Sequence, residues 1–168
     1  MNNAWKNLMS WVEEGLGGDY KPPVVPILPP TPAPPPPAPQ PSNPAQIPLK
    51  VSNWATAIAA EEGANPASNN PGNLKWSTLT ASWGGTKWKQ AQDGGWLCQF
   101  PTYNQGFFAL CNFLKLACEG ELIISNPQPC TLEAFTKRYA GNPPQGYIDG
   151  VATRLGVSLQ MPISSFLT

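Results

Sequence analysis

The segment VSNWATAIAAEEGANPASNNPGNL, residues 51–74, carries the clearest structural signal in this chain. Its first part places apolar residues at the spacing i, i+3, i+4 and i+7, which marks one face of an α-helix. These residues are Val51, Trp54, Ala55 and Ile58. Gly63 follows at a position suited to stop a helix. We therefore predict a helix with a buried face that ends at this glycine and leads into a loop.

The second of the two glutamates before this glycine falls on the apolar side of the predicted helix. At about 100° per residue, Glu62 lies about 20° from Val51 around the axis. Glu61 lies near the edge of the apolar stripe, where water reaches more easily. A carboxyl group held against apolar side chains is hard to ionise, so its pKa rises, and such an acid can protonate the departing oxygen of a glycosidic bond. The alternative interpretation is an ordinary solvated glutamate in the last turn of a helix.

The segments after this loop predict a mostly helical domain with a small irregular or β section, an α+β arrangement. Residues 76–100 contain glycine pairs, threonines and tryptophans without helical period, which indicates loops and a short hairpin. Residues 105–119, QGFFALCNFLKLACE, are apolar nearly all round, as expected of a central buried helix. Apolar stripes then predict helices over residues 131–140 and 145–155, with Tyr147 on the stripe of the second.

The order of these features resembles the lysozyme-like superfamily, in particular lytic transglycosylases and goose-type lysozymes. A helix ending in Glu62, followed by NNPGNL at residues 69–74, resembles the family's catalytic glutamate and the loop that lines its cleft. FPTYNQGFFALCNFL, residues 100–114, resembles the segment that leads into the family's central helix. AFTKRYAGNPPQGYIDGV, residues 134–151, resembles the later tyrosine-containing motif and the helix after it. The likeness is closest to small bacteriophage-associated members with an NNPGN-type loop.

The resemblance implies a set of site residues and no cofactor or metal. Glu62 is the general acid and afterwards the base, and Asn73 contacts the sugar or its acetamido group. Tyr139 lies near the catalytic carboxyl and helps to fix its orientation. Tyr103 and Gln105 are further candidates for the substrate cleft. The sequence departs from the family pattern where GNLK stands in place of a GLMQ-type loop, which affects the details of substrate placement.

The type of glycosidic reaction depends on a second carboxylate. A hydrolase uses one to activate water or as a nucleophile. A lytic transglycosylase needs a single glutamate, because the sugar's own 6-hydroxyl closes a ring. Asp93 and Asp149, the aspartates after residue 48, belong to no motif, so we favour the transglycosylase over a muramidase-type hydrolase. A non-catalytic virion structural or wall-binding protein that keeps the fold is the alternative from another class.

The composition excludes several other chemistries. The chain has no histidine, which rules out Ser-His-Asp and Cys-His nucleophilic catalysis and histidine-containing zinc sites. Ten basic and ten acidic residues give a formal net charge of zero, so we expect no long-range attraction to nucleic acid. The four cysteines include no CxxC pair, and we favour buried free thiols over one or two disulfides.

Two further segments precede the predicted catalytic domain of residues 49–168. Residues 1–18 predict a short amphipathic helix, a possible anchor that needs a partner such as a virion structural protein or a membrane surface, with a frayed terminus as the alternative. Between Pro22 and Pro48 the chain has 14 prolines in 27 residues, which favours extended polyproline II. We therefore predict a semi-rigid linker over residues 19–48, with an SH3-type ligand as the alternative.

The predicted location follows from these segments. No signal peptide is visible at the start of the chain, so we expect synthesis in the host cytoplasm. A wall-cutting domain on a long spacer suits a phage virion component, which the particle brings to the peptidoglycan glycan strands of its host. A lysis enzyme released through a holin is the alternative route to the wall.

Overall fold

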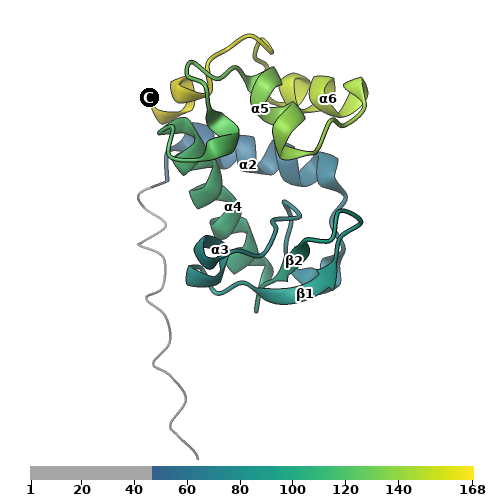
Figure 1. Ribbon diagram of the computed structural model, residues 1–168. Helices are drawn as coiled ribbons and strands as arrows, with labels where there is room; N and C mark the ends of the chain where they lie inside the picture. The colour runs from purple at the N-terminus through teal and green to yellow at the C-terminus, as the bar shows by residue number, and fades with distance from the viewer. Residues whose placement is uncertain (1–46) are drawn as a thin grey trace, which may run out of the picture. The chain divides into compact units, whose positions relative to one another are not determined.

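The computed structural model describes residues 47–168, a mostly helical domain with a small two-stranded antiparallel sheet. Figure 1 shows α2, α5 and α6 gathered at one end, the hairpin with α3 at the other, and α4 running between them. The predicted fold class, helical with a small β section, is thereby confirmed. The predicted helix over residues 1–18, and the linker over 19–48 apart from its last two residues, lie outside the described range. No helix within the described range is long and apolar enough to cross a bilayer.

Helix α2 (Leu49–Glu62) packs against α4, α6 and the C-terminal 3-10 helix η4 (Ile163–Leu167). It buries the face that the apolar spacing predicts, because Val51, Trp54 and Ile58 have no exposed surface. The indole of Trp54 contributes the largest side chain of this face, and aromatic rings bury more apolar area than aliphatic side chains. The predicted buried helix is therefore confirmed.

Gly63 ends α2 in the left-handed backbone conformation, with φ at 53°. Glycine adopts this conformation at little cost, whereas a Cβ atom makes it unfavourable for most other residues. Termination here leaves Glu62 half-buried in the last turn of the helix. The chain then passes through the short 3-10 helix η2 (Pro66–Ser68) into the NNPGNL loop.

The antiparallel hairpin pairs β1 (Thr86–Gln90) with β2 (Trp96–Gln99). Its register is irregular between Lys87 and Gln90, which is where a bulge lies. The hairpin confirms the short β element that the glycine pairs and threonines of residues 76–100 indicate.

The same region contains a short helix, α3 (Thr78–Ser82), that the sequence analysis missed. The side-chain oxygen of Ser77 accepts a hydrogen bond from the backbone N–H of Thr80 at 3.2 Å. The side-chain oxygen of Thr80 accepts one from the backbone N–H of Ser77 at 2.8 Å. This reciprocal cap is the signal in the sequence, since five residues are too few to show an apolar period.

Two asparagines of the NNPGNL loop bind the loop to the hairpin. The side-chain nitrogen of the buried Asn70 donates to the carbonyls of Leu74 and Cys98 at 2.9 and 3.1 Å. Its side-chain oxygen accepts from the backbone N–H of Leu74 at 2.9 Å. The side chain of Asn69 donates to the carbonyl of Phe100 at 3.0 Å. These bonds satisfy buried backbone groups and hold the loop against β2.

Helix α4 (Tyr103–Cys118) is the predicted central helix. Thr102 caps its N-terminus, with its side-chain oxygen accepting from the backbone N–H of Gln105 at 3.2 Å. Seven residues of the helix are buried: Gly106, Ala109, Leu110, Cys111, Leu114, Ala117 and Cys118. This burial on several sides agrees with a sequence that is apolar nearly all round.

Helices α5 (Leu132–Tyr139) and α6 (Gln145–Leu155) confirm the last two predicted helices. The 3-10 helix η3 (Ile123–Ser125) connects α4 to α5 and was not predicted. The αL residue Gly156 ends α6, with φ at 67°. The later elements therefore follow the sequence pattern as α2 does.

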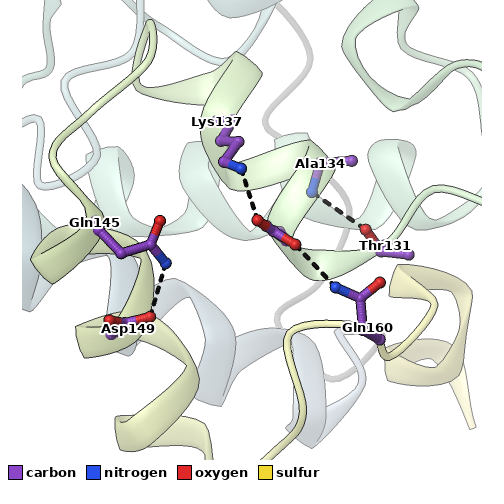
Figure 2. Close-up of polar contacts among 7 residues, drawn as sticks. Thr131, Ala134, Lys137, Gln145, Asp149 and Gln160 are labelled. Carbon is purple, nitrogen blue, oxygen red and sulfur yellow. Dashed lines mark hydrogen bonds and ion pairs between the residues drawn. The ribbon is translucent and has the colours of Figure 1, made fainter.

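The loop after α6 is attached to α5 by polar contacts that Figure 2 shows. The carboxylate of Glu133 accepts from Lys137 at 2.6 Å and from Gln160 at 2.8 Å. The hydrogen bond from Lys137, followed by that from Gln160, lowers the pKa of Glu133 because both favour the charged carboxylate. On α6, Gln145 donates to the exposed Asp149 at 2.9 Å. Asp149 therefore belongs to the outer surface of its helix.

All four cysteines of the chain lie in the described domain, where they are buried and form no disulfide. Burial raises the pKa of the Cys111 and Cys118 thiols to about 12. Protonated thiols are poor nucleophiles, so these cysteines act as small apolar side chains. The favoured prediction of buried free thiols is confirmed.

Candidate functional site

A cleft of about 1000 Å³ is lined by the end of α2, the NNPGNL loop, the hairpin turn, the end of α5 and the start of α6. Both Glu61 and Glu62 line this cleft. A smaller cavity of about 570 Å³ lies among α2, α6 and η4, and the described residues that line it include no acid. The acid–base chemistry expected of Glu62 therefore belongs to the larger cleft.

Glu62 is held at both of its carboxylate oxygens. The hydroxyl of Tyr147 donates to Oε1 at 2.7 Å, and the side-chain nitrogen of Asn73 donates to Oε2 at 2.8 Å. The carboxyl group is half-buried, and each oxygen keeps a further lone pair for another partner. The position of Glu62 on the apolar stripe predicts apolar surroundings, whereas the structure adds two polar neighbours. Because these donors come from α6 and from the loop, they fix the orientation of the carboxyl group.

Asn73 of the NNPGNL loop lies beside Glu62 and also lines the cleft. Its side-chain nitrogen bonds the Glu62 carboxylate and also approaches the Glu62 carbonyl at 3.4 Å. Its φ of 47° is left-handed, a conformation that asparagine tolerates better than most residues. The side-chain nitrogen of Asn73 is thus hydrogen-bonded to Glu62, which leaves its side-chain oxygen to accept from a substrate. The contact of Asn73 with the sugar or its acetamido group stays a prediction.

Tyr139 also lines the cleft and lies close to the acid, but its hydrogen bond goes to the loop. Its hydroxyl donates to the backbone carbonyl of Gly72, and its ring packs near Phe113 and Phe135. Burial of the hydroxyl raises its pKa well above the ordinary value, and the nearby charge of Glu62 adds to this. Tyr139 therefore contacts the loop that carries Asn73, and its hydroxyl is not hydrogen-bonded to Glu62.

Tyr147 is the site residue that the sequence analysis missed. Its place on an apolar stripe indicated a core residue, and the structure gives it a bond to Glu62. Burial, followed by the hydrogen bond to Glu62, raises the pKa of its hydroxyl, so the group stays a protonated donor. A tyrosine on a buried face needs a partner for its hydroxyl, and a carboxyl on the neighbouring apolar face needs a donor. These two unmet needs in the sequence were the signal that could have paired Tyr147 with Glu62.

Tyr103 and Gln105 are not among the residues that line this cleft. Tyr103 is 54% exposed and stacks on Phe107 of its own helix. The backbone and side chain of Gln105 both contact the Thr102 cap. The first turn of α4 packs against the Asn69 side of the loop, while Glu62 bonds the other end of the loop.

Two further carboxylates line the described cleft, and each is paired with a cation. Asp93 forms an exposed ion pair with Lys75, whose hydrogen bond lowers the pKa of that carboxyl. Glu61 accepts from Arg154 of α6 at 2.6 Å. Asp149 does not line the cleft. No unpaired second carboxylate therefore accompanies Glu62 among the described lining residues.

Comparisons of the chain with protein-family models, curated proteins and solved structures give no significant match. Within residues 47–168, no group of three or more acidic, cysteine or histidine side chains gathers in a way that suits a metal ion. The function is therefore inferred from the geometry around Glu62 and from the sequence resemblance.

Proposed function

We propose that this chain cleaves peptidoglycan glycan strands between N-acetylmuramic acid and N-acetylglucosamine, with Glu62 as the acid. The observation that carries the proposal is the half-buried carboxyl group of Glu62, held at both oxygens inside a large cleft. General acids are positioned by neighbouring groups so that the proton faces the leaving oxygen. A cleft of about 1000 Å³ has room for more than one sugar ring of a glycan strand.

The proposed reaction is that of a lytic transglycosylase. Glu62 gives its proton to the glycosidic oxygen as the bond to the muramic acid C1 breaks, which leaves an oxocarbenium-like centre. The resulting carboxylate then takes the proton from the 6-hydroxyl of the same sugar, and O6 bonds to C1. The products are a free N-acetylglucosamine hydroxyl and a 1,6-anhydromuramic acid end. No water is consumed, and the acid regains its proton.

The pairing of the other carboxylates favours this route over hydrolysis. A hydrolase of this type needs a second carboxylate to activate water or to act as a nucleophile. In the cleft, Glu61 is bonded to Arg154 and Asp93 to Lys75. A carboxylate already neutralised by a cation is a weaker base and nucleophile. A single glutamate is sufficient for the transglycosylase.

The sequence resemblance supports the same reading and extends it. Helix, glutamate, NNPGNL loop, central helix and tyrosine motif follow one another in the order of the lysozyme-like superfamily. The described domain presents Glu62, Asn73 and Tyr139 around one cleft. We propose a lysozyme-like fold for this domain and a place in a phage virion, where the proline-rich segment spaces the enzyme from its attachment.

The products formed by the full chain on purified peptidoglycan test this function. We expect soluble fragments that end in 1,6-anhydromuramic acid, lighter by one water than the corresponding reducing ends, in mass spectra. Reducing ends in their place would assign a muramidase-type hydrolase. Wall binding without any released fragment would assign the non-catalytic alternative.

Tyr147→Phe is expected to lower the rate of glycan cleavage by about 10-fold, because one charge-assisted hydrogen bond to the acid is lost. The ring stays in place, so the melting temperature is expected to change little. Tyr103→Phe makes the same chemical change outside the cleft and serves as the matched control. Initial rates of fragment release from both variants decide the matter, and equal rates would remove Tyr147 from the site.

A further inference from the structure

The two glutamates at the end of α2 bind two residues on one face of α6. Tyr147 and Arg154 are seven residues apart, two turns of helix, so both side chains point the same way. The first donates to Glu62 at 2.7 Å and the second to Glu61 at 2.6 Å. Building on the proposed function, we infer that Glu61 and Arg154 are positioning residues for the catalytic acid. Their ion pair sets the separation of α6 from α2, and it neutralises a negative charge beside Glu62.

Gly150 makes this close approach possible. A Cβ atom at this position would lie 2.6 Å from the carboxyl carbon of Glu61 and 2.7 and 2.8 Å from its oxygens. Gly146, about one turn earlier on the same helix, would meet nothing within 4 Å. Glycine destabilises a helix relative to alanine, so its presence inside α6 calls for a structural explanation. At Gly150 the explanation is steric, because the Glu61 carboxylate occupies the space that a Cβ atom would need.

The charge balance gives the inference a distinctive consequence. An unpaired negative charge beside Glu62 disfavours its ionisation, whereas an unpaired positive charge favours it. Arg154 and Glu61 cancel one another in the intact pair. The other groups that face the acid or line its cleft stay the same when this pair is changed: Tyr147 of α6, Tyr139 and Arg138 of α5, Asn73 of the loop, and the Lys75–Asp93 ion pair. Any change in the pH dependence of Glu62 in these variants is therefore caused by the change in the Glu61–Arg154 pair.

The partial exposure of the Glu61–Arg154 pair allows its effect on the catalytic site to be measured apart from its effect on stability. Half of the Arg154 side chain and 20% of the Glu61 side chain are exposed. Because the Arg154 end of the pair is open to solvent, the pair is expected to contribute little to stability, and variants at both positions are expected to fold. A structural role alone would change the melting temperature without shifting the pH profile.

The test is the pH profile of kcat for the full-length protein on peptidoglycan fragments at low ionic strength. Arg154→Gln leaves the Glu61 charge unpaired and is expected to move the alkaline limb to higher pH, because a nearby negative charge disfavours the charged carboxylate. Glu61→Gln leaves Arg154 unpaired and is expected to move it down by a similar amount. The double variant is expected to return to the wild-type profile. Lys115→Gln, which breaks an exposed ion pair on α4, is the control and should shift nothing.

The positioning effect is read separately from the charge effect. Both single variants are expected to lower kcat at the optimum by about 3- to 10-fold with KM within about twofold, because Tyr147 is less well placed. Gly150→Ala is expected to lower kcat similarly by displacing the Glu61 carboxylate, while Gly146→Ala should not. Equal falls in the two glycine variants would overturn the steric part of the inference.

The ionisation of Glu62 provides a readout that needs no activity. The ¹³C chemical shift of its carboxyl carbon, followed against pH, should show the same opposite displacements in Arg154→Gln and Glu61→Gln. Displacements in one direction, or none, would overturn the inference even if the wild type cleaves glycan. Opposite displacements in a protein without glycan cleavage would support the pairing and overturn the proposed function.

Discussion

Glu62→Gln is expected to abolish glycan cleavage, with a loss of at least about 10²–10⁴-fold, while the domain stays folded. An amide cannot give a proton to the glycosidic oxygen, and it cannot take one back from the 6-hydroxyl. The new side chain has nearly the same shape. Its oxygen can still accept from Tyr147, and its nitrogen can donate to the side-chain oxygen of Asn73 once that amide turns over. The loss is therefore one of chemistry and not of packing.

Release of soluble fragments from purified peptidoglycan, together with the melting temperature, checks this expectation. Glu119→Gln is the matched control, because Glu119 is the C-cap residue of α4 and pairs with Lys115 outside the cleft. The control should keep wild-type activity, and both variants should melt within a few degrees of the wild type. Appreciable cleavage by Glu62→Gln would place the acid elsewhere and end the assignment.

Among alanine substitutions at the glycines of the described domain, Gly106→Ala is expected to have the largest effect on stability. A Cβ atom on this buried residue of α4 would lie 1.8 Å from the backbone oxygen of Asn69. Backbone atoms cannot move aside as a flexible side chain does, so α4 and the NNPGNL loop have to separate. Overpacking of this kind costs about 3 kcal/mol, which outweighs the gain of about 1 kcal/mol for alanine in a helix.

The free energy of unfolding, from denaturant titration of the full chain, measures this effect. Gly146→Ala is the control, since it gains helix propensity and meets no neighbour within 4 Å. We expect the control to be as stable as the wild type or more so. Activity is expected to fall in Gly106→Ala beyond the loss of folded protein, because the displaced loop carries Asn73 away from the acid. A stable and active Gly106→Ala would show that the loop does not depend on this contact.

The residue pattern alone determined the four longer helices of the described domain, α2, α4, α5 and α6, and the faces that they bury. Periodicity is a local property, so the spacing of Val51, Trp54 and Ile58 was sufficient to define the buried face of α2. The stop at Gly63 is local as well, because it depends on the backbone freedom of a single residue. The location of Glu62 on the apolar side followed from the same geometry. The histidine-free composition alone also removed whole classes of catalytic chemistry.

Only the tertiary structure decided what each of those faces meets. Tyr147 and Glu62 are 85 residues apart in the chain, and their bond depends on how α6 crosses the end of α2. The same crossing brings Arg154 to Glu61 across 93 residues. A periodic pattern shows that a side chain points inward, but it carries no information about the partner opposite. For this reason the sequence placed the acid, and packing between distant segments supplied the groups that hold it.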